Sequence, residues 1–305
     1  MHDRYPGRVR IVEVGPRDGL QNEAGIVDVD TKVALIEALV DAGVRAVECG
    51  SFVSPKWVPQ MADTAAVFQK LKRQAGVAYS ALAPNLRGLA AAVGCGVEEI
   101  AVFTSASETF SKRNINRSID ESLTRLRVVA AEALARNIRL RGYVSCALGC
   151  SFEGEIPASA VARRAKELIA MGCYEVSLGD TIGVGTPLKA RAMIETVATE
   201  VPINQLAVHF HDTWGQALAN ILAALQLGVA VVDASVAGLG GCPYAPGASG
   251  NVSTEDVVYL LDGMRIETGI QLEKLASAGR MISSALGRKP VSKAALAIAA
   301  RSSEL

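Results

Sequence analysis

Two histidines, His209 and His211, are the residues whose types and spacing point most directly to chemistry. Alternate residues of a β-strand share one face, so both imidazoles should point the same way, and neutral imidazole is a common metal ligand. The alternative is a hydrogen-bonded pair of core histidines. Asp18 could add a carboxylate and Asn251 an amide oxygen, and this combined set favours a metal. Such ligands suit octahedral Mg²⁺ or Mn²⁺ better than tetrahedral Zn²⁺, which usually recruits a thiolate.

Three charged residues could act beside such a metal. Arg17 precedes Asp18 in a loop framed by proline and glycine, and a permanent cation there could stabilise an oxyanion that develops on a substrate. An ordinary surface ion pair is the alternative. Glu48 and Asp180 lie within or just after apolar runs, where a buried carboxylate needs a partner. We expect Arg17 to be that partner; a structural salt bridge is the alternative for each carboxylate.

The thiol of Cys242 is a further candidate. It lies in a stretch, residues 238–250, that contains five glycines and could swing over a bound substrate as a mobile lid. Six cysteines in 305 residues are too sparse for the disulfide framework of a small secreted protein, so free thiols are expected. The other five lie mostly in hydrophobic runs and should be small core residues: Cys49, Cys95, Cys146, Cys150 and Cys173.

The elements that must position these residues are eight short, β-branched runs. Longer segments of helical period alternate with them, a pattern typical of βα units around a parallel sheet. Eight repeats favour a closed TIM (β/α)8 barrel, which needs about 250 residues, over an open doubly wound sheet. The predicted strands are Val9–Val14, Val44–Cys49, Val77–Leu82, Glu99–Phe103, Arg139–Ala147, Tyr174–Leu178, Gln205–His209 and Val231–Val236.

The predicted helices complete one continuous domain over residues 1–305, with the barrel at about 8–262 and C-terminal helices at about 263–305. No proline- or serine-rich linker interrupts the chain. In such a barrel all strands end on one face, so the candidate residues should meet there. The helical segments include Asp30–Ala42, Ser118–Arg136, Pro157–Met171, Gly215–Leu227, Gln271–Leu286 and Ser292–Arg301.

Composition excludes several classes of function. Lys plus Arg and Asp plus Glu both number 31, which leaves no basic excess for a nucleic acid. No apolar run reaches 18 residues, and the first residues resemble neither a signal peptide nor an Arg/Ser-rich transit peptide. The last three residues, Ser-Glu-Leu, differ from a peroxisomal Ser-Lys-Leu. We expect a cytoplasmic protein without a nucleic-acid or membrane partner.

Four stretches, in a match that covers nearly the whole chain, resemble the 3-hydroxy-3-methylglutaryl-CoA lyase family, a branch of the metal-dependent Claisen-type lyases and synthases. The resemblance implies a TIM barrel that cleaves this acyl-CoA substrate to acetoacetate and acetyl-CoA. The last stretch contains Cys242 and looks specific to the lyases. The stretches are Val12–Glu23, Ser51–Gln60, Ser177–Pro187 and Ala237–Tyr244.

The same resemblance implies a role for each candidate residue. Asp18, His209, His211 and Asn251 would bind Mg²⁺ or Mn²⁺, and Arg17 would lie at the thioester carbonyl. Lys112 and Arg113, with Asn114, resemble a segment near coenzyme A, although solvated surface charge is an equal alternative. The implied catalytic residues are Arg17, Cys242, Glu48, Asp180 and His209, and the implied substrate-binding residues are Arg17, Gln21, Ser51, Tyr143, Thr181 and Asn114.

Three other functions fit parts of this pattern. A lyase for longer 3-hydroxy-3-alkylglutaryl-CoA esters would need the same catalytic residues and a larger pocket. A condensing synthase, such as a homocitrate or isopropylmalate synthase, would share Arg17, Asp18 and both histidines but usually has a longer C-terminal region. A non-enzymatic barrel that holds a metal or coenzyme A would not need Arg17 and Cys242. The C-terminal helices are a reasonable interface for a homo-oligomer, either a dimer or a tetramer.

Overall fold

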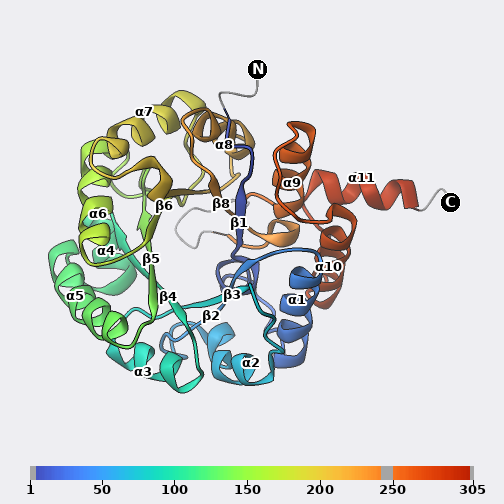
Figure 1. Cartoon of the computed structure of the whole chain (residues 1–305), viewed down its shortest axis with the longest axis horizontal. Coiled ribbons are helices and arrows are strands. Elements are labelled where there is room, and N and C mark those ends of the chain that lie inside the picture. Colours follow the sequence, from blue (N-terminus) through green and yellow to red (C-terminus); the bar gives the residue numbers. More distant parts are fainter. Residues whose placement is uncertain (1–4, 242–249, 303–305) are drawn as a thin grey trace.

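Eight parallel strands form a closed barrel in sequence order, with β8 pairing back onto β1 (Figure 1). The structure is a computed structural model and describes residues 5–241 and 250–302. The predicted TIM barrel is confirmed, and the alternative of an open sheet is wrong. The strands are β1 (Arg10–Glu13), β2 (Ala46–Ser51), β3 (Ala78–Leu82), β4 (Glu99–Ser105), β5 (Arg139–Ser145), β6 (Glu175–Asp180), β7 (Leu206–Phe210) and β8 (Val231–Ala234).

Helices surround the barrel, and each predicted helix is found within two residues of its expected ends (Figure 1). Local signals fix several boundaries: Asp28 caps the first helix through the Thr31 N–H, and Ser118 forms a capping box with Glu121. The helices are α1 (Val29–Asp41), α2 (Thr64–Lys70), α3 (Leu86–Gly94), α4 (Glu108–Ile115), α5 (Ile119–Ala135), α6 (Ala158–Ala170), α7 (Pro187–Ala198), α8 (Ala217–Gln226), α9 (Thr254–Gly263), α10 (Leu272–Ala285) and α11 (Lys293–Ser302).

Five strands differ from the prediction by two residues at one or both ends: β2, β4, β5, β6 and β8. β2 begins two residues later than expected and continues through Ser51, with an irregular register between Glu48 and Gly50. β5 stops at Ser145 because Cys146 has a φ of 61°, which an extended strand does not allow. The ends of β2 and β5 lie at the mouth of the barrel, so they affect how side chains enter the site.

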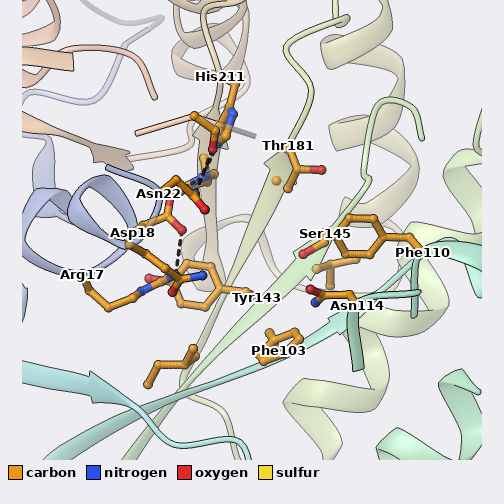
Figure 2. A pocket seen from close by; sticks show the side chains of 16 residues that line it. Arg17, Asp18, Asn22, Phe103, Phe110, Asn114, Tyr143, Ser145, Thr181 and His211 are labelled. Carbon is orange, nitrogen blue, oxygen red and sulfur yellow. Dashed lines mark hydrogen bonds and ion pairs between the residues drawn. The ribbon is translucent and has the colours of Figure 1, made fainter. Parts of the chain in front are cut away.

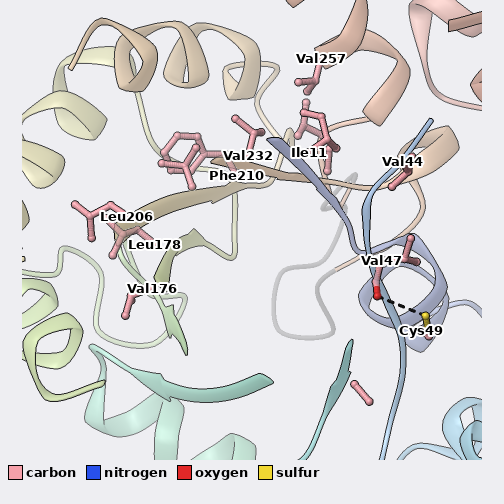
Figure 3. Close-up of a cluster of buried hydrophobic side chains, with 14 of the residues drawn as sticks. Ile11, Val44, Val47, Cys49, Val176, Leu178, Leu206, Phe210, Val232 and Val257 are labelled. Atoms are coloured by element: carbon pink, nitrogen blue, oxygen red, sulfur yellow. Dashed lines mark hydrogen bonds between the residues drawn. The ribbon is translucent and has the colours of Figure 1, made fainter. Parts of the chain in front are cut away.

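Apolar side chains on the outer face of the strands pack against the helices and form the main core (Figure 3). Leu178 and Phe210 on adjacent strands are almost fully buried there. Cys49 belongs to the same core, as predicted. In the described part of the chain all five cysteines are free thiols, which confirms that expectation for them, although Cys95 is only half-buried.

The C-terminal helices lie beside α1 and α9 on one side of the barrel (Figure 1). Before α10, the Gln271 N–H donates to the carbonyl of Ala42 at 2.7 Å. The carboxylate of Asp256 on α9 accepts the Ala294 N–H at 2.7 Å and so fixes the start of α11. Both predicted C-terminal helices are therefore confirmed and attached to the barrel. None of the helices in the described residues is long and apolar enough to cross a membrane.

Candidate metal centre and active site

A single π-helical turn after β1, Gly15–Gly19, presents Arg17 and Asp18 to the mouth of the barrel. The sequence predicts an irregular loop here. A Cβ on Gly19 would lie 2.6 Å from Ser235 Oγ and 2.7 Å from Leu239 Cβ, so only glycine lets the turn pack against the segment after β8. The turn is thereby held close to residues that follow the last strand.

The four predicted metal ligands meet at this mouth. His209 on β7 and His211 just after it place their Nε2 atoms 3.3 Å apart, and Asp18 Oδ2 lies 3.8 Å from His209 Nε2. One ligand atom from each of these three residues falls within 4.8 Å of the other two. The Asn251 amide donates to Asp18 Oδ2 at 2.9 Å. The prediction that the two histidines share one face is confirmed.

The protonation states of this cluster suit a divalent cation. Burial lowers the pKa of His211 to about 4, so its imidazole is neutral at pH 7. Burial also lowers the pKa of His209, but contact with Asp233 and the charge of Asp18 outweigh it and raise this pKa. Burial alone would raise the pKa of Asp18, whereas the charge of Arg17, with a smaller contribution from His209, lowers it to about 2. Two imidazole nitrogens and an ionised carboxylate that converge on one point can hold a divalent metal ion.

Arg17 is fixed between two carboxylates. Its Nε donates to Glu48 Oε2 at 2.6 Å, and its Nη1 donates to Asp18 Oδ1 at 2.7 Å. Its guanidinium carbon lies 5.8 Å from the centre of the Tyr143 ring. Glu48 is fully buried; burial raises its pKa, and the charge of Arg17 opposes that shift. The expected pairing of Arg17 with Glu48 is therefore found, and the carboxylates of Glu48 and Asp18 together fix the orientation of the guanidinium.

Asp180, the second carboxylate expected to pair with Arg17, has other partners. Its two oxygens accept the backbone N–H groups of Gly185 at 2.7 Å and Val184 at 3.2 Å. Burial raises its pKa, and these amide bonds oppose the shift. The carboxylate of Asp180 is thus held by the loop after β6, and in the described residues the ion pairs of Arg17 are with Asp18 and Glu48. Asp180 shapes the loop that carries Thr181.

A cavity of about 160 Å³ opens beside Arg17 and the histidines (Figure 2). Four of the predicted substrate-binding residues line it with Arg17: Gln21, Tyr143, Thr181 and Asn114. Ser51 does not line it in the described part of the chain; it is buried on β2, where its N–H donates to Thr64. The cavity also has an apolar wall that the sequence analysis missed, formed by Leu82, Phe103 and Phe110.

Cys242, the predicted loop thiol, lies outside the described residues. Of the predicted coenzyme A segment on α4, Asn114 lines the cavity. Lys112 is exposed beside Glu108 at 3.5 Å, and Arg113 lies 4.5 Å above the ring of Phe152. The two basic side chains thus contact neighbouring surface residues.

A buried ion network inside the barrel was not predicted. Arg141 on β5 donates to Asp233 on β8 at 2.7 Å and to Glu175 on β6 at 2.7 Å. Ser177 also donates to Asp233, at 2.7 Å. The signal that singled out Glu48, a charged residue inside an apolar strand, is equally present in these strands, and applying it throughout would have found the network.

The sequence did not predict two further buried carboxylates, which contact the residues directly after β8. Glu13 accepts the Val236 N–H at 2.9 Å, and Glu255 accepts the Ala237 N–H at 2.9 Å. Burial raises the pKa of Glu13 to about 7 and that of Glu255 to about 8. Ala237 has a φ of 56°, a conformation unusual for a non-glycine residue, so these bonds help to hold a strained turn.

Comparison with known proteins gives the same family along almost the whole chain. The HMGL-like family model matches residues 8–282. The chain is 57% identical to the mitochondrial hydroxymethylglutaryl-CoA lyase of Homo sapiens, over 96% of this chain and 90% of that protein. It is 59% identical to a cytoplasmic 3-hydroxy-3-methylglutaryl-CoA lyase of Danio rerio, over 95% and 87%. It is 57% identical to a 3-hydroxy-3-isohexenylglutaryl-CoA/hydroxymethylglutaryl-CoA lyase of Pseudomonas aeruginosa, over 97% and 99%.

Solved structures agree with this assignment. A hydroxymethylglutaryl-CoA lyase from Pseudomonas aeruginosa superposes with a TM-score of 0.96 at 56% identity and covers 98% of this chain and 99% of that one. An HMG-CoA lyase from Acinetobacter baumannii, in complex with coenzyme A and 3-methylmalate, superposes with a TM-score of 0.91 at 35% identity, with 95% of each chain covered. This chain belongs to the HMGL-like family of hydroxymethylglutaryl-CoA lyases.

Proposed function

We propose that this protein is a lyase that cleaves 3-hydroxy-3-methylglutaryl-CoA to acetoacetate and acetyl-CoA. The observation that carries the proposal is the convergence of Asp18, His209 and His211 beside Arg17 at one mouth of the barrel. Relatives of that name match 96% and 98% of the chain. A condensing synthase would use the same polar residues, but the relatives reported above are lyases.

The residues that would hold the metal are Asp18, His209, His211 and Asn251. The group would be Mg²⁺ or Mn²⁺, and its chemistry is to acidify a hydroxyl that it binds and to neutralise developing negative charge. His211 is neutral and Asp18 is ionised at pH 7, so neither has to lose a proton before it binds a cation.

Arg17 supplies the second centre of positive charge. Breaking the bond between C2 and C3 leaves a ketone at C3 and an enolate on the departing acetyl-CoA carbon. The guanidinium of Arg17, oriented by Glu48 and Asp18, stabilises the enolate oxygen. Because burial and paired carboxylates hold this side chain in place, little reorganisation is needed when the charge develops.

Two proton transfers complete the reaction. The C3 hydroxyl loses its proton to a nearby carboxylate or imidazole, for which Asp18 and His209 are placed at the cavity. The enolate carbon then gains a proton, and the sequence resemblance makes Cys242 its donor. Asp180 acts through the loop that presents Thr181, while Gln21, Tyr143 and Asn114 contact the substrate in the cavity. For Ser51, a role in substrate binding is supported by the sequence resemblance alone.

A substrate with a longer alkyl group is a second candidate. Leu82, Phe103 and Phe110 form an apolar wall of the cavity that a methyl group alone does not require. The Pseudomonas aeruginosa relative is named for both an isohexenyl and a methyl substrate. Comparing kcat/KM for the methyl and isohexenyl esters tests this: a ratio within tenfold supports a broad lyase, and no turnover of the longer ester restricts the enzyme to the methyl substrate.

We extend the proposal to the organisation of the protein. Residues 1–305 would form one catalytic domain, which the bonds from Gln271 and Asp256 into the barrel support. The partner is the acyl-CoA substrate; a structure of the Acinetobacter baumannii relative contains coenzyme A. We also predict that the chain assembles into a homo-oligomer. We predict a cytoplasmic location; the relatives include both mitochondrial and cytoplasmic lyases.

The direct test is to measure acetoacetate from 3-hydroxy-3-methylglutaryl-CoA with Mg²⁺, with and without EDTA. We expect product that EDTA abolishes, and metal-independent cleavage or no cleavage contradicts the proposal. His209→Ala should lose metal and turnover, whereas Cys242→Ala should keep metal and lose turnover. Incubating acetyl-CoA with 2-oxoacids and following thiol release is the control for a synthase; faster thiol release than cleavage would favour that rival.

A further inference from the structure

Asp233 on β8 lies behind the candidate metal ligand His209. Its Oδ2 is 3.5 Å from His209 Nδ1, the ring nitrogen opposite the one that faces Asp18 and His211. Only 1% of Asp233 is exposed, so no bulk water weakens this contact. The two nitrogens of one imidazole therefore face different groups: a buried carboxylate behind, and the candidate metal centre in front.

The carboxylate of Asp233 is surrounded by groups that donate hydrogen bonds. Arg141 Nη2 donates to Oδ1 at 2.7 Å, while Ser177 Oγ donates to Oδ2 at 2.7 Å and Arg141 Nη1 donates to Oδ2 at 3.2 Å. Arg141 is itself held by Glu175 at 2.7 Å. These contacts leave the carboxylate no freedom to turn away from His209.

This arrangement determines which nitrogen of His209 carries the proton. If the proton were on Nε2, the lone pair of Nδ1 would face the anionic Oδ2 and be repelled by it. With the proton on Nδ1, the N–H would face the carboxylate across the 3.5 Å contact, which does not meet hydrogen-bond geometry in this structure, and the lone pair of Nε2 would face the metal centre. A carboxylate behind a histidine ligand is a general way to fix the tautomer and the ring orientation.

We propose that Asp233 is a positioning residue that, braced by Arg141 and Ser177, orients His209 and keeps its Nε2 free to bind the divalent cation. This inference rests on the proposed function for its metal site, but it assigns a role to a residue that neither the family motifs nor the site prediction include. Removal of such a carboxylate partner typically costs about tenfold to a hundredfold in metal affinity.

The test is Mn²⁺ affinity measured by electron paramagnetic resonance on the purified full chain without substrate. Asp233→Asn should weaken Mn²⁺ binding by about tenfold to a hundredfold, because an amide meets the donors of Arg141 and Ser177 with its own N–H. Glu175→Gln is the matched control: it neutralises a carboxylate of the same buried Arg141 but does not contact His209. Its affinity should stay within threefold of wild type. Equal losses in both variants, or unchanged affinity in Asp233→Asn, overturn the proposal.

A second measurement needs no variant at position 233. In metal-free wild type with ¹⁵N-labelled histidine, long-range ¹H–¹⁵N spectra should show His209 protonated at Nδ1, with the His211→Gln variant providing the assignment. Protonation at Nε2 overturns the proposal. Lyase activity is scored separately: a wild type that binds Mn²⁺ through an Asp233-dependent site but makes no acetoacetate contradicts the proposed function and leaves this inference standing.

Discussion

The mouth of the barrel and its interior use the same kinds of side chain to opposite effect. In the interior, Arg10 and Arg141 balance Glu175 and Asp233, and both oxygens of each carboxylate have partners. At the mouth, one guanidinium, that of Arg17, faces two carboxylates, and two imidazole nitrogens point at each other from 3.3 Å. In the interior, the charges of the arginines and the carboxylates compensate one another. At the mouth, the single guanidinium does not compensate both carboxylates.

This difference separates structural from functional charge. Buried charges that compensate one another hold strands together, and substituting one of them should cost stability. Buried acceptors that converge without enough donors indicate a missing ligand, and substituting one of them should cost binding or turnover. Asp233 is the point of contact between the two regions, because it completes the interior network and also faces a ligand at the mouth.

Substitution of Arg141 in the interior network should produce the largest loss of stability. Arg141→Met would leave the buried carboxylates of Asp233 and Glu175 without their guanidinium, and breaking a buried pair in this way costs about 3–5 kcal/mol. Arg10→Met, which removes a half-exposed arginine from the same Glu175, is the control and should cost less than about 1 kcal/mol. Urea unfolding followed by circular dichroism measures both. Similar losses in the two variants would contradict a structural role for the buried arginine.

Substitution of Arg17 at the mouth should produce the largest loss of turnover. Arg17→Met removes the charge that stabilises the enolate oxygen, and loss of such a preorganised partner costs about 10²- to 10³-fold in kcat. Acetoacetate formation under saturating substrate gives the value. Arg10→Met again serves as the control and should retain turnover within twofold. A loss of tenfold or less for Arg17→Met would remove Arg17 from the reaction.

Metal affinity should depend on pH with a definite sign. Contact with Asp233 and the charge of Asp18 raise the pKa of His209 above its ordinary value, so its Nε2 gains a proton at a higher pH than that of an ordinary imidazole. A proton on that atom competes with the cation, and affinity should fall by up to about tenfold per pH unit below this pKa. Asp18 and His211, with pKa values of about 2 and 4, should not contribute there. Mn²⁺ titrations between pH 6 and 8 measure the slope, and a flat profile would contradict the account.

A pH-dependent change in stability is expected at Glu255, a buried carboxylate that accepts backbone N–H groups. Burial raises its native pKa to about 8, from an ordinary value of 4.5. A raised native pKa favours the folded state at low pH, and that contribution is lost as the pH rises from 5 through 8. Relative to wild type, the urea midpoint of Glu255→Gln should therefore increase from pH 5 to pH 8. A constant difference between the two proteins would show that Glu255 is not protonated in the folded state.

Much of the fold could be predicted because each βα unit has its own local signal. β-branched runs and glycine-closed helices identify all eight strands and the C-terminal helices. The π-helical turn of Gly15–Gly19 has no such signal, because its shape depends on contacts with Ser235 and Leu239, more than 200 residues away. The early end of β5 at Cys146 likewise depends on a left-handed residue that sequence patterns do not reveal.

The candidate site could be predicted where residue type and strand position suffice. His209, His211, Asp18 and Arg17 lie at strand ends, and barrel closure brings them together. Asp180 shows the limit: its position at a strand end was correctly identified, but whether it pairs with Arg17 or with the loop after β6 depends on how that loop folds.

The central claim is that the mouth, and not the interior network, holds the cation. The most direct measurement is anomalous diffraction from crystals of the wild-type protein grown with Mn²⁺. We predict one peak per chain, bounded by Asp18, His209 and His211. A peak at the carboxylates of Asp233 and Glu175, or no peak at the mouth in crystals of protein that shows Mn²⁺-dependent cleavage, would contradict the account.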